Sequence, residues 1–150
     1  MIVKPTTDIN EIKAVLCNKH IYDTITDDNS VNADDYEPDM GGENLYIGGY
    51  VKGEIMALMV YHKYLDGNSC HVQVLPEFRK EYALKFGEQS LLFRGTLPLY
   101  AVIPDLYKNV LEFAKHFGFK VIDKKLNSYV KNGKSYNDNI LRFNNGFFKR

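Results

Sequence analysis

Apolar residues near the start of the chain recur at the spacing of an amphipathic helix. Residues 2–5 are predicted to form a short strand, and Thr7 and Asp8 then offer a helix cap. The helical spacing is carried by Ile9, Ile12, Val15 and Leu16. We expect this helix to stop near Asn18 and a second helix to cover residues 21–28. Residues 29–43 are rich in Asp, Asn, Gly and Pro, a composition that predicts a long loop.

The pattern changes to strands from Leu45 onward. Strands are predicted over residues 45–51, 55–65 and 70–75, separated by turns at 52–54 and 66–68. Because both turns are short, these three strands are expected to form an antiparallel meander.

Helices and strands alternate in the second half of the chain. A helix with Leu84, Gly87, Glu88 and Leu91 on one side is expected to end near Arg94-Gly95. Residues 99–103 form a continuous apolar run typical of a strand buried on both faces. A further helix is predicted from Pro104 through Phe117, with Gly118 as its cap. Strands over 119–124 and 140–143 complete the order, with 131–134 as a hairpin tip. This order predicts one domain of the α+β class over residues 1–150.

Composition narrows the classes of protein that fit. The chain has 150 residues, of which 45% are hydrophobic, enough for one core. Its 19 basic and 19 acidic residues cancel, which disfavours nucleic acid or an anionic membrane as partner. Two cysteines, Cys17 and Cys70, are too few for a disulfide scaffold, so a reducing compartment is expected. No apolar run resembles a signal peptide or a membrane span, and we expect a cytoplasmic protein.

A proline breaks the strand that ends near residue 75 and leads into a basic turn and a helix. The segment runs Val74-Leu75-Pro76-Glu77-Phe78-Arg79-Lys80. Free amides at the start of a helix, together with Arg79 and Lys80, predict a place for a phosphate or pyrophosphate.

Three features of the chain carry a resemblance to a known family: the order of elements, the V-x-P-x-x-R turn at 74–79, and the helix that ends in Gly-Phe at 110–119. In these features the chain resembles the GNAT N-acetyltransferases. With residues 19–28, the chain also looks like acetyltransferase-like proteins encoded by bacteriophages. The resemblance implies a mostly antiparallel central sheet of about six to seven strands, flanked by about four helices. In that family the fourth and fifth strands splay apart, and the pantetheine arm of acetyl-CoA lies in the gap.

The resemblance also implies a set of acetyl-CoA-binding residues: Val74, Leu75, Arg79, Lys80, Glu81, Tyr82, Ala83, Leu84 and Asn109. The family binds pyrophosphate on a loop of the form R/Q-x-x-G-x-G/A, in which glycines let the phosphates approach the backbone closely. Here Tyr82 and Leu84 stand at the two glycine positions. Either Ala83 supplies the small residue of a shifted loop, or Arg79 and Lys80 offset the poorer amide geometry with charge.

The family's catalytic positions differ as well. The residue aligned with its glutamate base is Asn68, and the residue aligned with its tyrosine acid is Ala114. His71 is the candidate base instead, because a histidine titrates near the pH needed to deprotonate an amine; the alternative is a structural histidine. Tyr107 is the candidate acid, and its alternative is an aromatic residue that packs and exposes its hydroxyl. His62 is expected near His71, but two histidines without an identified carboxylate do not predict a metal site.

Two functions from different classes follow from these residues. The first is an enzyme that transfers an acetyl group from acetyl-CoA to a primary amine, on a small molecule or a protein, by direct attack on the thioester. The acidic residues between 27 and 39 favour a cationic acceptor such as a lysine side chain or a polyamine. The second is a catalytically inactive binding or structural module of a phage particle or host-interaction protein, located in the virion or the host cytoplasm.

The C-terminal third offers two further interactions. Phe147 and Phe148 are more apolar than a solvated tail requires, so they either pack on the domain or contact another chain, in a homodimer or with a protein partner. Nucleic-acid binding through the basic residues 115–150 is disfavoured, because they lack a dense Arg/Lys stripe with stacking aromatics.

Overall fold

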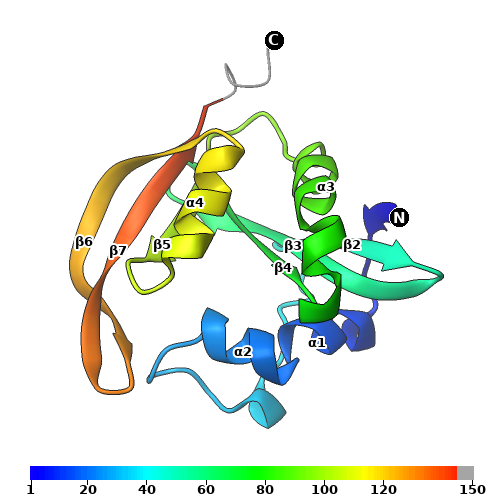
Figure 1. Cartoon of the computed structure of the whole chain (residues 1–150), viewed down its shortest axis with the longest axis horizontal. Helices are drawn as coiled ribbons and strands as arrows, with labels where there is room; N and C mark the ends of the chain where they lie inside the picture. The colour runs from blue at the N-terminus through cyan, green and yellow to red at the C-terminus, as the bar shows by residue number, and fades with distance from the viewer. Residues whose placement is uncertain (145–150) are drawn as a thin grey trace.

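A mixed sheet of seven strands, in the order β1-β2-β3-β4-β5-β7-β6, organises the protein (Figure 1). The computed structural model describes residues 1–144, so Phe147 and Phe148 lie outside the described residues. The strands are β1 (Ile2–Pro5), β2 (Leu45–Val51), β3 (Glu54–Tyr64), β4 (Gly67–Val74), β5 (Leu99–Pro104), β6 (Phe119–Lys131) and β7 (Lys134–Phe143). The helices are α1 (Ile9–Leu16), α2 (Lys19–Ile25), α3 (Arg79–Leu91) and α4 (Lys108–His116), with short 3-10 turns at Ala33–Asp35 and Pro76–Phe78. The predicted α+β class is confirmed.

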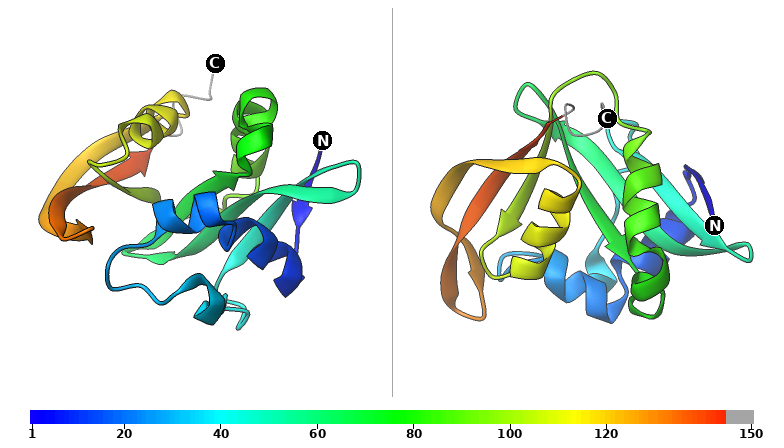
Figure 2. Two further views of the ribbon diagram at one scale, coloured as in Figure 1. Left: turned by 60° about the horizontal axis from the view of Figure 1, so that its bottom comes forward. Right: turned by 45° about the horizontal axis from the view of Figure 1, so that its top comes forward.

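Helices cover both faces of this sheet, and the side-chain alternation of β3 divides the core between them (Figure 2). Leu58 and Val60 face α1, together with Ile12, Val15, Leu16 and Ile21. Ala57, Met59 and Tyr61 face the opposite side, where they share a core with Phe86 of α3 and Phe117. Because both faces of β3 are covered, it is an apolar run with little polar alternation.

The strands β4 and β5 separate soon after they meet, as the resemblance implied. Their parallel pairing consists of Asn68 with Leu99 and Ser69 with Tyr100. Beyond these pairs β4 continues to Val74, while β5 pairs antiparallel with β7 from Tyr100 to Pro104. The sheet therefore opens into a V, and α2 lies beside its open end (Figure 1).

A glycine sets the closed end of this V. A Cβ atom added to Gly67 would lie 2.0 Å from the carbonyl oxygen of Pro98, which no side chain can accept. Gly67 therefore lies inside β4, and the prediction that it belongs to a turn is wrong. The turn is Leu65–Asp66, where Leu65 itself takes a positive φ of 49°. The glycine that predicted a turn is required instead because the backbone of β4 approaches that of Pro98 closely at this position.

The remaining differences from the sequence prediction have local causes. The β6–β7 hairpin is much longer than predicted, because its outer residues pair by backbone hydrogen bonds while their side chains stay exposed, which leaves no apolar alternation. Its tip is as predicted, with positive φ at Asn132 and Gly133. Helix α4 begins later than predicted, because Pro104 still pairs with Asp138 of β7.

The second helix also begins earlier than predicted. The side chain of Asn18 accepts a hydrogen bond from the amide of His20 at 2.9 Å, which starts α2 at Lys19. The helices within residues 1–144 include none that is long and apolar enough to cross a membrane.

Candidate active site

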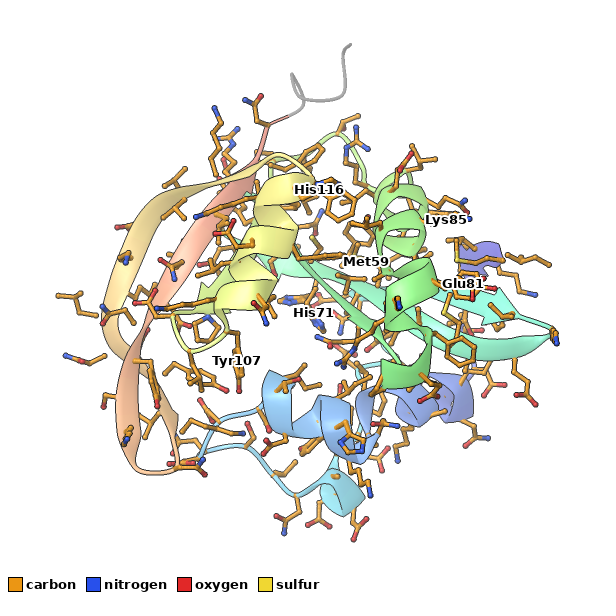
Figure 3. The ribbon with its side chains drawn as sticks, in the orientation of Figure 1. Met59, His71, Glu81, Lys85, Tyr107 and His116 are labelled. Carbon is orange, nitrogen blue, oxygen red and sulfur yellow. The ribbon has the colours of Figure 1, made fainter. Side chains whose placement is uncertain are left out.

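A cavity of about 730 Å³ lies at the gap between β4 and β5. Its walls come from both faces of the sheet: α2 and the segment after it contribute Tyr22, Ile25 and Val31, and α3 and α4 contribute Gly87 and Phe113. The cavity therefore reaches through the sheet where the two strands no longer pair. His71 of β4 lies between α3 and α4 in projection, and Tyr107 lies at the start of α4 (Figure 3). Both predicted catalytic residues line the cavity.

His71 faces the α1 and α2 side of the sheet, because it pairs with Val60 of β3. Its Nδ1 is buried and has no hydrogen-bond partner among the described residues. Its ring lies 5.8 Å from the ring of His62, edge to face, so the predicted proximity of the two histidines is confirmed. The Nε2 of His62 lies 2.9 Å from the hydroxyl oxygen of Ser69, which gives that histidine a protein partner.

Burial lowers the pKa of His71 to about 4, and the neighbouring His62 contributes in the same direction. At neutral pH the imidazole of His71 is therefore uncharged and able to accept a proton, but it is a weak base while the cavity is empty. A ligand group that donates a hydrogen bond to Nδ1 would satisfy the buried atom. The described residues include no group of three or more side chains arranged to hold a metal ion.

Tyr107 is held by a chain of hydrogen bonds that the sequence does not reveal. The hydroxyl of Tyr129 donates to the carbonyl oxygen of Thr26, so its single proton is committed. The hydroxyl of Tyr107, 3.1 Å from that of Tyr129, must therefore be the donor of the pair. To act as an acid, Tyr107 has to turn its proton from Tyr129 toward the cavity. Burial, and then the hydrogen bond with Tyr107, raises the pKa of Tyr129 above its ordinary value.

The predicted cofactor turn is a helix rather than a loop. The 3-10 turn Pro76–Phe78 leads directly into α3 at Arg79, so Tyr82 and Leu84 lie inside the helix. The Nε of Arg79 donates to the carbonyl oxygen of Val74 at 2.9 Å, which holds this side chain against the end of β4.

Several backbone and side-chain groups of this segment are already engaged. The amide of Leu75 donates to the carbonyl oxygen of Met56 at 2.9 Å, so it extends the β3–β4 pairing. The ring of Tyr82 packs against that of Phe78, at 6.2 Å between centroids, while Leu84 is 53% exposed. The bulk at the family's glycine positions is thus directed into packing or into solvent.

None of the predicted acetyl-CoA residues lines the cavity. The residues concerned are Val74, Leu75, Arg79, Lys80, Glu81, Tyr82, Ala83, Leu84 and Asn109. Those from Arg79 to Ala83 occupy the first turns of α3, where Glu81 and Lys85 are labelled in Figure 3, and Asn109 is exposed in the first turn of α4. Their contact with a cofactor remains a prediction, and it concerns the rim of the gap rather than its interior.

The positions that correspond to the family's base and acid have other tasks. Asn68 lies at the closed end of the V, where its backbone N–H donates to the carbonyl oxygen of Pro98 at 2.9 Å. Ala114 is buried and lines the cavity without a polar group. Sequence reasoning missed Tyr129, because its partners Tyr107 and Thr26 are 22 and 103 residues away along the chain.

The comparisons with solved structures agree with this geometry. A chimera of spermidine N-acetyltransferase SpeG from Vibrio cholerae and hSSAT has a TM-score of 0.76 at 10% identity, covering 100% of both chains. A GNAT acetyltransferase from Streptococcus pneumoniae has a TM-score of 0.72 at 11% identity, over 94% of this chain and 97% of that one. The protein has the GNAT fold. An aminoglycoside 6'-acetyltransferase of type Ii also matches, with a TM-score of 0.65 at 17% identity over 95% of this chain and 96% of that one.

By sequence, no protein-family profile and no curated protein matches this chain. The GNAT fold therefore comes from the structure, and at these identities the likeness describes the fold alone. The narrower resemblance to bacteriophage proteins stays a prediction.

Proposed function

We propose that this protein is an acetyl-CoA-dependent N-acetyltransferase that acts on a primary amine by direct attack on the thioester. The observation that carries the proposal is the cavity between the separated strands β4 and β5, on a GNAT fold. A gap of this kind leaves backbone groups of β4 without a neighbouring strand, and such groups can hold and polarise an extended thioester arm.

The chemistry requires little beyond positioning. The amine nitrogen forms a bond to the thioester carbonyl carbon, the carbon–sulfur bond breaks, and the products are an amide and the thiol of coenzyme A. The nitrogen loses one proton as the sulfur gains one. Nδ1 of His71 is the acceptor for the first proton and the hydroxyl of Tyr107 the donor for the second. Each is then restored by exchange with solvent.

The start of α3 is the proposed contact for the pyrophosphate. Phe78, at the helix N-cap, provides no side-chain hydrogen bond to the first turn, and Arg79 and Lys80 are exposed there. Because Nε of Arg79 is used by Val74, the side chain offers its remaining guanidinium donors from a fixed position.

A thermal-shift experiment tests the donor site. Acetyl-CoA at about a thousandfold excess over a micromolar Kd is expected to stabilise the folded protein by about 4 kcal/mol. Arg79→Glu is expected to abolish the shift, and Lys120→Glu, an exposed charge reversal on β6, to retain it. A shift that survives Arg79→Glu would move the pyrophosphate away from α3.

Release of thiol with a panel of amines tests the catalytic roles. His71→Gln and Tyr107→Phe are each expected to lower kcat by about a hundredfold, the usual effect of removing a general acid or base. If both variants keep the wild-type rate, these two roles are discarded while the fold and the donor site stand.

The alternative is a GNAT-fold binding module without catalysis. It is favoured by the combination of Asn68 and Ala114 at the family's base and acid positions with Tyr82 and Leu84 in place of glycines. Its signature is the absence of any thermal shift with acetyl-CoA and of thiol release with every amine.

A further inference from the structure

Several acidic residues between positions 23 and 39 have hydrogen-bond or ion-pair partners outside the cavity. Asp28 accepts hydrogen bonds from the amides of Asn132 and Gly133, both at 2.9 Å. Asp23 lies 3.4 Å from the Nζ of Lys131, and Glu37 lies 3.1 Å from the Nζ of Lys13. None of the acidic residues of this segment is among the cavity-lining residues. Asp27 and Asp23 act on the wall from outside it, where, after burial and the contact with Tyr107, they add to the raised pKa of Tyr129. The sequence-based argument for a polyamine or a lysine side chain is therefore weakened, because no carboxylate of this segment lines the cavity.

The cavity wall carries almost no charge. Among the described residues that line it, Asp138 is the one with a charged side chain, and its carboxylate accepts a hydrogen bond from Ser128 at 2.8 Å. The two histidines of the wall are His62 and His71, and the second is neutral at physiological pH because burial lowers its pKa to about 4. Asp138 is therefore the one carboxylate of the described wall, and it lies on β7 rather than next to α2.

Three of the tyrosines that line the cavity donate their hydroxyl protons to protein acceptors. Tyr22 donates to the carbonyl oxygen of Val31, Tyr129 to that of Thr26, and Tyr107 to Tyr129. Because these three phenol protons are committed within the protein before a ligand binds, the three residues present mainly the faces and edges of their rings to the cavity.

The part of the wall next to α2 is an uncharged compartment, in which an apolar and aromatic cluster lies beside the hydroxyl-bearing Thr24, Thr26 and Ser30. The rings of Tyr22 and Tyr36 meet edge to face, with 5.8 Å between centroids, and they are joined by Leu16, Ile25 and Val31. This compartment lies on the same side of the sheet as His71, because Leu16 belongs to the core on that side. A second ammonium group placed there would meet no carboxylate of the cavity wall.

We propose that the acceptor is a monoamine with an apolar or aromatic body, and that the uncharged wall of the α2 compartment discriminates against a polyamine. This inference rests on the proposed function and names its substrate class. The body of the amine fills the compartment of Leu16, Tyr22, Ile25, Val31 and Tyr36, and the amino group reaches the strand gap at His71. Apolar surroundings also favour the neutral, nucleophilic form of the amine.

Matched amines test the inference. Butylamine and putrescine share one carbon chain and differ by an amino group, and phenethylamine adds an aromatic body. We expect kcat/KM to be about tenfold or more higher for butylamine than for putrescine, and highest for phenethylamine. Equal or higher kcat/KM for putrescine or spermidine would overturn the inference while leaving the transferase intact.

A substitution in the compartment provides the second arm. Ile25→Asp adds a carboxylate to the wall and is expected to shift the putrescine to butylamine ratio by about tenfold in favour of putrescine. Ile25→Asn is the uncharged control, and Leu126→Asp places the same charge outside the cavity, at a residue that is 73% exposed. Val31→Asp serves as the second variant, because its side chain is 56% exposed and the change is compatible with folding. An unchanged ratio in both carboxylate variants would place the acceptor elsewhere.

Amine binding without acetyl-CoA separates the two proposals. If no amine releases thiol, the proposed function fails. Thermal shift alone then tests the compartment. If phenethylamine raises the Tm of the wild type but not that of Ile25→Asp, the proposed amine site with its uncharged wall is supported. No shift with phenethylamine, or a larger one with spermidine, overturns it.

Discussion

The buried imidazole of His71, whose Nδ1 has no hydrogen-bond partner among the described residues, makes the stability of this protein depend on pH. Replacing His71 should remove this part of the pH dependence. In the folded protein its pKa is about 4, against 6.5 for an ordinary histidine, because the buried ring disfavours the charged form and His62 adds to the effect. Between these two values the unfolded chain binds a proton that the native protein does not. The contribution of His71 to the free energy of unfolding therefore stays level above about pH 6.5, falls as the pH drops toward 4, and levels off below that.

The size of the effect follows from the shift. A change from 6.5 to about 4 corresponds to about 3 kcal/mol when the whole interval is crossed. This is an upper figure, because the side chain as a whole is only partly buried even though its Nδ1 is buried. Between about pH 7.5 and about pH 4.5, most of this, about 2.5 kcal/mol, should be lost.

Urea denaturation of the wild type and of His71→Gln at both pH values measures this loss. Other groups also titrate in this range, so the quantity of interest is the difference between the two proteins in their pH dependence. We expect the wild type to lose about 2 kcal/mol more than His71→Gln on acidification. His20→Gln, a change of an exposed histidine, is the control and should follow the wild type. Parallel pH dependences for the wild type and His71→Gln would refute the burial argument.

Three further predictions concern the frame of the site. Gly67→Ala should lower the free energy of unfolding by about 1–3 kcal/mol, because its Cβ meets the Pro98 carbonyl; Gly95→Ala, where no atom lies within 4 Å, is the urea-denaturation control. Tyr129→Phe removes the hydrogen bonds with both Thr26 and Tyr107, so it should lower the free energy of unfolding by about 1–2 kcal/mol, more than Tyr107→Phe does. A larger loss for Tyr107→Phe would contradict the assigned donor direction. Asp28→Asn should lower the Tm at neutral pH, and the gap should close as the pH falls through the native pKa of Asp28, which the amides of Gly133 and Asn132 hold below its usual range. A gap of equal size at low pH would argue against those two hydrogen bonds.

Much of the fold was predictable because its signals are local. The side chain of Asp8 accepts from the amides of Asn10 and Glu11, as expected of a helix cap. Gly118 takes a positive φ of 99° after α4, and Asn132-Gly133 turns the last hairpin. Each of these features depends on residues within a few positions of one another. The long β6–β7 hairpin escaped prediction because its pairing leaves no trace in the burial of its side chains.

The site was predictable only in part. His71 and Tyr107 both line the cavity. The alternation of β4 could be read from the sequence, whereas the helix that follows Tyr107 begins later than its sequence predicts. The commitment of Arg79 to Val74 and the uncharged wall of the α2 compartment could not be foreseen. Hydrogen-bond partners and cavity walls depend on how distant segments pack together, so they cannot be predicted from local periodicity.

The sequence by itself determined which segments become helices and strands and in what order, since turn chemistry, capping and periodicity act over a few residues. The tertiary structure alone decided that β4 and β5 part after Ser69 and that Nδ1 of His71 is buried without a partner among the described residues. It also decided that Asp23 and Asp28 contact the β6–β7 hairpin and that Glu37 pairs with Lys13 of α1. These outcomes follow from contacts between residues far apart in the chain, whose energies exist only once the sheet has formed.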